Sequence, residues 1–262
     1  MKTSKVAEYI TDWLKVYAQK AKVNGFVVGV SGGIDSAVTS TLCAKTGFPT
    51  LCVEMPIHQA ENQVNRAEEH IKQLSEQFSN VSKVRVNLTS TFQDLIRVLP
   101  KAESSTKVDL SLANTRARLR MSTLYYFAGL HGYLVAGTGN KVEDFGVGFY
   151  TKYGDGGVDL SPIANLMKSE VYLLAAYLGV PTSIQNAQPT DGLFGDSRTD
   201  EDQIGASYDE LEWAMQMKAA GKTETNFEGR QKEVFTIFTR LNAANQHKML
   251  PIPVCEIPEE LK

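Results

Sequence analysis

Long apolar runs, paired cysteines and an excess of either charge are all absent from this sequence of 262 residues. No stretch approaches the roughly eighteen unbroken apolar residues of a membrane-spanning helix, so we expect no membrane partner. The cysteines are Cys43, Cys52 and Cys255, and none belongs to a C-x-x-C pair, so neither a disulfide framework nor a zinc knuckle is indicated. A formal net charge of −3 argues against a surface that coats nucleic acid.

The amino-terminal stretch also lacks the solid apolar core of a signal peptide. Residues 4–22 instead place Val6, Ile10, Leu14 and Tyr17 on one stripe, as an amphipathic helix does. We therefore expect a cytoplasmic protein. Hydrophobic residues make up 42% of the chain and charged residues 22%, which is ordinary for a globular protein with a sizeable core. Because no linker or repeat interrupts the sequence, we expect one domain over residues 1–262.

Strand-like and helix-like segments alternate along the first half of the chain. Short apolar runs predict strands at 25–30, 50–55, 83–88 and 133–138. Helix-forming stretches predict helices at 4–22, 36–47, 60–79, 91–99 and 110–132. Such alternation is typical of a doubly wound parallel sheet with helices on both faces, a Rossmann-like α/β fold. From about Lys168 onward the sequence indicates helices and loops, which we expect to form a helical C-terminal part of the same domain.

The first predicted strand ends in the string SGGIDS at 31–36, at the corner where a helix begins. Parallel sheets bind ligands beyond the carboxyl ends of their strands, and a helix start offers unpaired N–H groups and the positive end of its dipole. An anion is therefore the expected ligand, and Gly32 and Gly33 let the backbone approach it closely. Asp35 would repel phosphates unless Mg²⁺ lay between them, so the loop predicts a phosphate chain with Mg²⁺.

Other phosphate-binding motifs do not fit this loop. The G-x-x-x-x-G-K-[ST] pattern needs a lysine that is missing here, and G-x-G-x-x-G is not matched either. A glycine-rich turn in which Asp35 and Ser36 only cap the helix remains the alternative. The string S-G-G-x-D-S after an apolar strand resembles the pyrophosphate loop of the ATP pyrophosphatase family, which has an adenine nucleotide alpha hydrolase-like fold. Members of that family cleave ATP between its α and β phosphates and transfer AMP to an oxygen of the substrate.

Further strings resemble one branch of that family. They are NTRARLRM at 114–121, GTGNKVED at 137–144, TKYGDGGVD at 151–159, QPTDGL at 188–193, DEDQIGASYDELE at 200–212 and HKMLPIP at 247–253. Together they closely resemble bacterial ammonia-dependent NAD synthetases, over nearly the whole chain from Val6 to Pro253. The resemblance implies a ligase that amidates deamido-NAD to NAD in the last step of NAD biosynthesis. ATP would be the co-substrate, and an adenylated intermediate would form with release of pyrophosphate, then AMP.

The resemblance implies roles for those positions that match the family. For ATP it implies the loop and three further positions: Gly29, Val30, Ser31, Gly32, Gly33, Ile34, Asp35, Ser36, Thr138, Lys168 and Thr190. For Mg²⁺ it implies Asp35 and Glu143. For deamido-NAD it implies Arg118, Lys152, Asp159, His247 and Lys248. No nucleophile or general base is nominated, because positioning and charge neutralisation suffice for this chemistry.

Plainer interpretations of these residues remain open. Glu143 could be a solvated loop carboxylate, Lys168 an ordinary lysine in the first turn of a helix, and His247 with Lys248 mere surface residues. At helical spacing Arg116 and Arg120 share one face of the predicted helix, and Arg118 points elsewhere. Only the resemblance selects Arg118 as the arginine that binds deamido-NAD.

The partners and the rival functions also follow from the resemblance. It implies ATP, deamido-NAD and free ammonia as substrates, because the chain has no room for a glutamine-hydrolysing domain. It implies a homodimer, with the helix at 110–132 as a candidate interface. The alternatives are a GMP synthetase-like amidation, a transfer-RNA thiolation and an ATP-binding sensor without turnover. A thiolation enzyme would need cysteine pairs and a basic face for RNA, and the sequence shows neither.

Overall fold

A parallel sheet forms the centre of the computed structural model, which describes residues 1–59, 61–103, 105–190 and 199–262. The strands of these described residues are β1 (Gly25–Gly29), β2 (Thr50–Glu54), β3 (Val81–Arg85) and β4 (Tyr133–Val135). They lie in the order β3-β2-β1-β4, and every neighbouring pair is parallel. The predicted α/β class is thus confirmed.

The strand order reverses at β1. From β1 the chain proceeds to β2 and β3 on one side, and it returns to the other side of β1 for β4. The carboxyl ends of β1 and β4 therefore flank the point of reversal. In open α/β sheets this is where a crevice forms between loops that turn in opposite directions, and ligands bind there.

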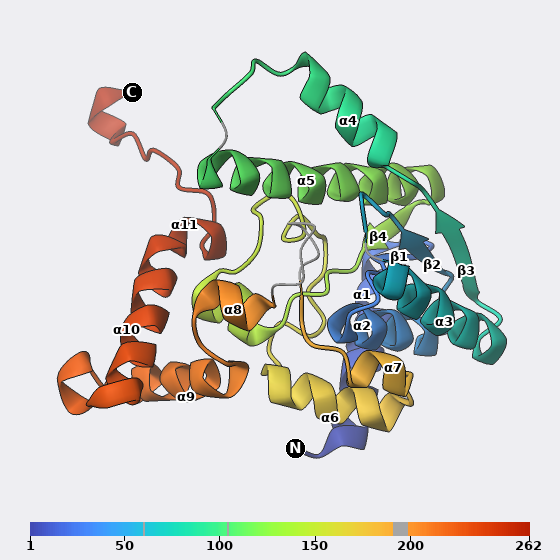
Figure 1. The fold of residues 1–262 in the computed structure, drawn as a ribbon. Helices are drawn as coiled ribbons and strands as arrows, with labels where there is room; N and C mark the ends of the chain where they lie inside the picture. The colour runs from blue at the N-terminus through green and yellow to red at the C-terminus, as the bar shows by residue number, and fades with distance from the viewer. Residues whose placement is uncertain (60, 104, 191–198) are drawn as a thin grey trace.

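Helices cover both faces of the sheet (Figure 1). On one face lie α1 (Thr3–Ala21), α2 (Ile34–Lys45), α3 (Glu61–Gln77) and α6 (Lys168–Leu178). On the other face lie α4 (Thr89–Val98) and α5 (Thr106–His131). The strands read as continuous apolar runs for this reason. Val28 packs into the cluster of α1 and α2, while its neighbour Val27 packs toward α4 and α5.

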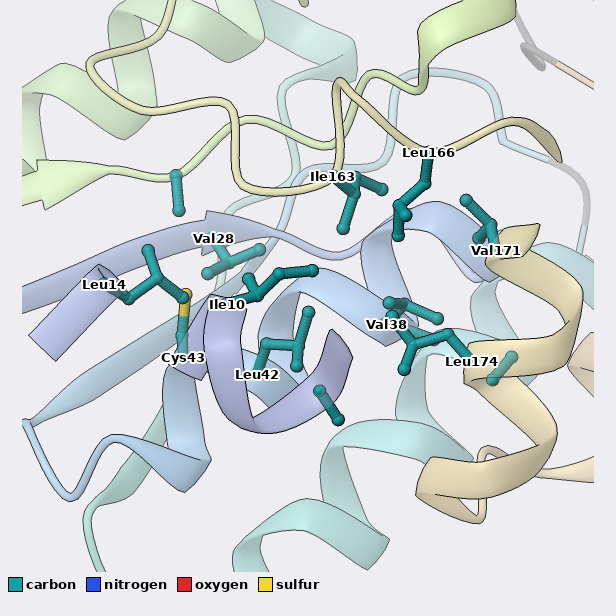
Figure 2. Packing of buried hydrophobic residues seen from close by; sticks show 14 of the residues in the cluster. Ile10, Leu14, Val28, Val38, Leu42, Cys43, Ile163, Leu166, Val171 and Leu174 are labelled. Carbon is teal, nitrogen blue, oxygen red and sulfur yellow. The ribbon is translucent and has the colours of Figure 1, made fainter. Parts of the chain in front are cut away.

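The largest apolar cluster joins α1, β1, α2 and α6. Figure 2 shows Leu14, Val28, Leu42 and Leu174 lying together in it, and all four are fully buried. Burial of each such side chain contributes roughly 1.5–3 kcal/mol. The cluster fixes α6 against α2, so the first residues of these two helices are held at the same edge of the sheet.

The C-terminal part is helical, as expected, and has a second apolar cluster. Its elements are the π-helix η1 (Val142–Val147), α7 (Thr182–Gln185), α8 (Asp200–Ile204), α9 (Tyr208–Ala219), the 3₁₀ turn η2 (Glu224–Asn226), α10 (Gly229–Ala244), α11 (Gln246–Met249) and the 3₁₀ turn η3 (Glu259–Leu261). The second cluster packs Leu211 of α9 and Phe238 of α10 against Val142 and Val147 of η1. Among the described helices, none combines the length and the apolar character needed to cross a bilayer.

Several element boundaries differ from those predicted, each for a local reason. Strand β3 ends at Arg85 instead of residue 88, because the paired register with β2 ends at Glu54, although the N–H of Leu88 still donates to the carbonyl of Pro56 at 3.0 Å. Helix α2 starts two residues earlier than predicted, at Ile34, so Asp35 lies inside its first turn. Helix α5 starts at Thr106 because Ser105 caps it, accepting a hydrogen bond from the N–H of Val108.

Candidate active site

The loop between β1 and α2 is held by its own serines. The Oγ atom of Ser36 donates to the carbonyl of Gly33 at 2.9 Å and accepts from the N–H of Ser31 at 3.2 Å. The Oγ atom of Ser31 accepts from the N–H of Gly33 at 3.2 Å. No side chain caps the amino end of α2, so the reading of Asp35 and Ser36 as mere caps is wrong. The N–H groups of the first turn therefore remain directed at an incoming anion.

Gly32 makes the loop's shape possible. Its φ of +81° lies in the left-handed region, whereas its neighbour Gly33 is extended with φ −94°. A Cβ on Gly32 would lie 2.4 Å from the carbonyl oxygen of Gln63 in α3. The loop is therefore packed closely under the start of α3, and only glycine permits that approach.

Lys168 joins the two predicted metal carboxylates. Its Nζ donates to Oδ2 of Asp35 at 2.6 Å and to Oε1 of Glu143 at 3.0 Å. The Lys168 side chain is 3% exposed, and those of Asp35 and Glu143 are 16% and 17% exposed. Lys168 is also the first residue of α6, where the helix dipole disfavours a cation. The two carboxylates offset that penalty, and they converge on one point between β1 and β4.

Asn140 and Tyr208 orient these carboxylates. Asn140 is completely buried, and its Nδ2 donates to Oδ1 of Asp35 at 3.1 Å. Its Oδ1 accepts from the N–H of Glu143, also at 3.1 Å. The hydroxyl of Tyr208 donates to Oε1 of Glu143 at 2.5 Å and lies 3.2 Å from Oδ2 of Asp200. The ring of Tyr208 faces the Lys168 ammonium, with 4.7 Å from Nζ to the ring centroid.

Burial and charge set the protonation of the cluster. Burial alone would lower the pKa of Lys168, but Asp35 and Glu143 outweigh it and the pKa lies above its usual value. Burial opposes ionisation of Glu143, yet the charge of Lys168 and the hydrogen bond from Tyr208 hold its pKa below the usual value. Burial raises the pKa of Asp35, and the charge of Lys168 only partly counters it. The ammonium and Glu143 are therefore ionised at neutral pH.

The π-helix η1 carries Glu143 into the site. π-helices are rare and are frequently found at functional sites. The next residue, Asp144, lies against Gly139, where a Cβ would come within 2.2 Å of both carboxylate oxygens. Burial, followed by the charges of Glu143, Asp155 and Asp35, raises the pKa of Asp144 to about 8. Burial likewise raises the pKa of Asp155. With a pKa of about 8, Asp144 is largely protonated at neutral pH, which reduces the repulsion among the carboxyl groups at this edge of the sheet.

One cavity of about 270 Å³ lies between the carboxyl ends of the strands. Every residue predicted to bind ATP or Mg²⁺ lines it: Gly29, Val30, Ser31, Gly32, Gly33, Ile34, Asp35, Ser36, Thr138, Glu143, Lys168 and Thr190. Residues predicted from separate motifs are therefore brought together in space. Of the QPTDGL string, positions 191–193 lie outside the described residues.

The residues predicted to bind deamido-NAD do not line this cavity. Arg118 donates to the carbonyl of Lys152 at 3.3 Å, and Lys152 donates to the carbonyl of His247. Lys248 donates to the carbonyls of residues 148 and 150 at 2.8 Å each, and it lines a smaller neighbouring cavity of about 170 Å³. These residues form one connected group beside the main cavity, made by α5, the loop after η1 and α11.

Asp159 stands apart from that group. Its Oδ2 accepts from the N–H of Val135 at 2.8 Å, and its Oδ1 accepts from the hydroxyl of Tyr125 at 2.9 Å. The carboxylate thereby ties the loop before it to the end of β4 and to α5. The role of Asp159 in binding deamido-NAD stays a prediction, as do those of the other four residues.

The residues present fit a Mg²⁺ ion bound together with phosphate. Asp35 and Glu143 each direct a carboxylate oxygen at the same Nζ, at 2.6 Å and 3.0 Å, so both oxygens already face one cationic group. Among the described residues, no group of three or more histidine, cysteine or acidic side chains is arranged to hold a metal ion. A site completed by protein alone is therefore not indicated. Mg²⁺ commonly takes one or two carboxylates plus substrate phosphate oxygens, which matches this pair.

Three contributing residues were not predicted from sequence. Asn140 and Tyr208 lie within the quoted strings at 137–144 and 200–212, so their side chains could have been proposed as partners for Glu143. Arg120 lines the main cavity, where it donates to the carbonyl of Met55 at 3.0 Å, whereas Arg118 does not line it. Helical spacing separated these two arginines but could not show which one faced the site.

The fold and the loop together define a Rossmann-like nucleotide-binding protein with a pyrophosphate loop. A family model described as NAD synthase matches residues 6–251. The chain belongs to the NAD synthase family.

Individual relatives agree with this family. An NH(3)-dependent NAD(+) synthetase of Carboxydothermus hydrogenoformans is 41% identical over 207 residues, covering 78% of this chain and 82% of the relative. One of Syntrophomonas wolfei is 37% identical over 267 aligned positions, covering all of both chains.

Solved structures show the same fold. An NMN synthetase from Francisella tularensis superposes with a TM-score of 0.82 at 28% identity, covering 99% of each chain. An NH3-dependent NAD synthetase from Campylobacter jejuni has a TM-score of 0.77 at 26% identity, covering 98% of this chain and 100% of that one.

Proposed function

We propose that this protein is a ligase that forms NAD from deamido-NAD, ammonia and ATP, releasing AMP and pyrophosphate. One observation carries the proposal. Two carboxylates and a buried ammonium, Asp35, Glu143 and Lys168, converge beside an uncapped helix start at the carboxyl edge of the sheet. That arrangement suits a triphosphate with a divalent cation, and the family membership supports the choice of substrates.

The first step activates a carboxylate. An oxygen of the nicotinate carboxylate attacks the α-phosphorus of ATP, the bond to the β-phosphate oxygen breaks, and pyrophosphate leaves. Both reactants are anionic, so their repulsion must be offset. The loop N–H groups, the amino end of α2 and the Lys168 ammonium supply positive potential there. Asp35 and Glu143 would hold Mg²⁺, which supplies further charge neutralisation for the phosphates when bound.

The second step forms the amide. Ammonia attacks the carbonyl carbon of the adenylate, the bond to the AMP oxygen breaks, and the nitrogen loses a proton. Asp144 and Asp155 also line the cavity in which this step would take place. None of these groups acts as a covalent nucleophile, so positioning and electrostatics account for the proposed chemistry.

Amidation of the mononucleotide, which would give NMN, is the second candidate. It is favoured by the overall likeness to the structure of the Francisella tularensis NMN synthetase. Both proposed activities use the same ATP site. They differ only in whether the carboxylate that is amidated belongs to the dinucleotide or to the mononucleotide. The curated relatives, at up to 41% identity, are described as NAD(+) synthetases, so deamido-NAD is the preferred substrate.

We further infer a cytoplasmic homodimer. Helix α5 exposes Tyr126 and Leu130, which lie one turn apart on the same face and have relative accessibilities of 64% and 61%. Apolar residues exposed along one helix support an interface between copies. The connected group of Arg118, Lys152 and His247 begins on the same helix. Light scattering that gave the mass of a single chain at working concentration would contradict the dimer.

The test is product identification in a complete reaction. Purified protein is incubated with ATP, Mg²⁺, ammonium and either deamido-NAD or the mononucleotide, and all products are separated by chromatography. NAD, AMP and pyrophosphate in equal amounts are expected. ADP and phosphate in place of AMP and pyrophosphate would contradict the proposal. Faster turnover of the mononucleotide would select the second candidate.

Two variants assign the activity to the site. Asp35→Asn keeps the volume of the side chain but removes its charge, so turnover should fall by roughly a hundredfold or more. Asp12→Asn, on the exposed face of α1, is the matched control and should leave turnover unchanged. Equal activity of the two variants would contradict the metal-binding role of Asp35.

A further inference from the structure

A second cationic side chain lies over the phosphate loop, on α3. The first turns of α3 press against Gly32, since a Cβ there would lie 3.3 Å from Cβ of Arg66 and 3.2 Å from the N–H nitrogen of Ala67. The Nε of Arg66 donates to the carbonyl oxygen of Gly32 at 3.2 Å. The guanidinium is therefore fixed to the loop that is proposed to hold the phosphates.

The two Nη groups of the Arg66 guanidinium are available to bind a ligand. Arg66 lines the main cavity and is partly buried. Within the described part of the chain its hydrogen bond uses Nε, and neither Nη atom has a partner there. No carboxylate of the described residues forms an ion pair with it. A desolvated guanidinium without a counter-ion is unfavourable unless an anion completes it, and burial accordingly lowers the pKa of Arg66.

The other cations of the cavity are already engaged. Lys168 is shared between Asp35 and Glu143, and Arg120 donates from Nε to the carbonyl of Met55 and from Nη2 to Oε1 of Gln59. A triphosphate brings about four negative charges into a cavity whose walls already carry several carboxylates. An additional cation directed at the loop would therefore stabilise a bound triphosphate beyond what Lys168 supplies.

We propose that Arg66 binds the β- and γ-phosphates of ATP with its two Nη groups and retains the pyrophosphate formed in the first step. This inference rests on the proposed function of the site. A guanidinium presents parallel donors that match a phosphate in a bidentate way, and Nε stays on Gly32 so that the fork is pre-oriented. The contact is selective, because AMP lacks the phosphates that Arg66 reaches.

Binding of three probes tests the proposal by calorimetry with Mg²⁺ present: ATP, AMP and inorganic pyrophosphate. The principal variant is Arg66→Gln, whose side-chain amide places a donor at the depth of Nε and so can keep the bond to Gly32. ATP and pyrophosphate should each bind roughly tenfold to a hundredfold more weakly than to the natural protein. AMP affinity should change by less than about twofold, and inhibition by pyrophosphate should weaken in parallel.

Further variants separate binding from structure. Arg66→Lys keeps the charge but loses the fork, and it should recover part of the affinity for pyrophosphate. Arg97→Ala, an exposed arginine paired with Asp94, is the matched control and should bind all three probes like the natural protein. Thermal melting without ligand should be the same for Arg66→Gln and the natural protein.

Two results would overturn the inference. One is unchanged affinity of Arg66→Gln for ATP and pyrophosphate. The other is an equal loss of binding affinity for ATP and for AMP in Arg66→Gln, which would indicate that the substitution distorts the phosphate loop. Failure of the proposed function would look different, since the natural protein itself would then neither bind ATP nor release pyrophosphate.

Discussion

Replacing Lys168 by methionine should destabilise the protein strongly in the absence of Mg²⁺. The substitution keeps most of the side-chain volume and removes only the ammonium. Asp35 and Glu143 share the buried ammonium of Lys168 in the natural protein. In the variant, these two carboxylates would face each other with no cation between them. Removing one partner of a buried ion pair typically costs about 3–5 kcal/mol, because the remaining charge is left desolvated.

Protonation limits this cost and gives it a pH dependence. Burial already raises the pKa of Asp35, and loss of Lys168 would raise it further. One carboxylate can then take up a proton, which is easier at low pH. We therefore expect a loss of about 3 kcal/mol in the free energy of unfolding at pH 8, and a smaller loss at pH 5.

The assay is urea unfolding in a chelated buffer, followed by the same titration with excess Mg²⁺. Lys72→Met is the matched control, because Lys72 lies 4.0 Å from Glu76 on the solvent face of α3 with both side chains mostly exposed. The control should change the free energy of unfolding by less than about 0.5 kcal/mol. Mg²⁺ should stabilise Lys168→Met more than the natural protein, since it can replace the missing charge. A loss below about 1 kcal/mol without Mg²⁺ would refute the description of the cluster.

Other predictions concern the supports of the site. His70 is 1% exposed and burial lowers its pKa to about 4, so below the unfolded value of about 6.5 the unfolded state binds more protons. The free energy of unfolding should thus be unaffected by His70 above about pH 6.5 and should decrease toward pH 4. In urea titrations between pH 7 and pH 4.5, His70→Gln should lose about 2 kcal/mol less of this free energy than the natural protein loses. Tyr208→Phe should cost about 1.5–3 kcal/mol of stability at pH 7, because Glu143 loses a donor; an unchanged urea midpoint would argue against that bond. Gly139→Ala should lower turnover roughly a hundredfold by displacing Asp144, and activity within twofold of the natural protein would exclude that packing.

Local chemistry explains why the first strand, the loop and the second helix could be predicted. The apolar run ends abruptly at Ser31-Gly32-Gly33, and the helix that follows needs no distant partner to be recognised. The strand lengths were less predictable. Strand β4 stops at Val135, three residues short of the prediction, although Ala136 still donates to the carbonyl of Val27. How far a strand extends depends on its neighbours, and those are set by the whole fold.

The direct contacts of the site could not be predicted from separation along the chain. Lys168 lies 133 residues from Asp35 and 25 from Glu143, yet one Nζ binds both. The resemblance placed all three near phosphate, but the ion pairs arise from packing of α6 against α2 in the large apolar cluster. The π-helix could not be predicted from the sequence either, because a segment of six residues with i→i+5 hydrogen bonds leaves no distinct apolar period.

Oxygen transfer tests the proposed chemistry at its decisive bond. Deamido-NAD labelled with ¹⁸O in its carboxylate is converted with ATP, Mg²⁺ and ammonium, and the products are examined by mass spectrometry. If the carboxylate attacks the α-phosphorus in the cavity above β1 and β4, each AMP should carry one ¹⁸O atom and the pyrophosphate none. AMP without label, or label in pyrophosphate, would show that the substrate carboxylate is not adenylated there.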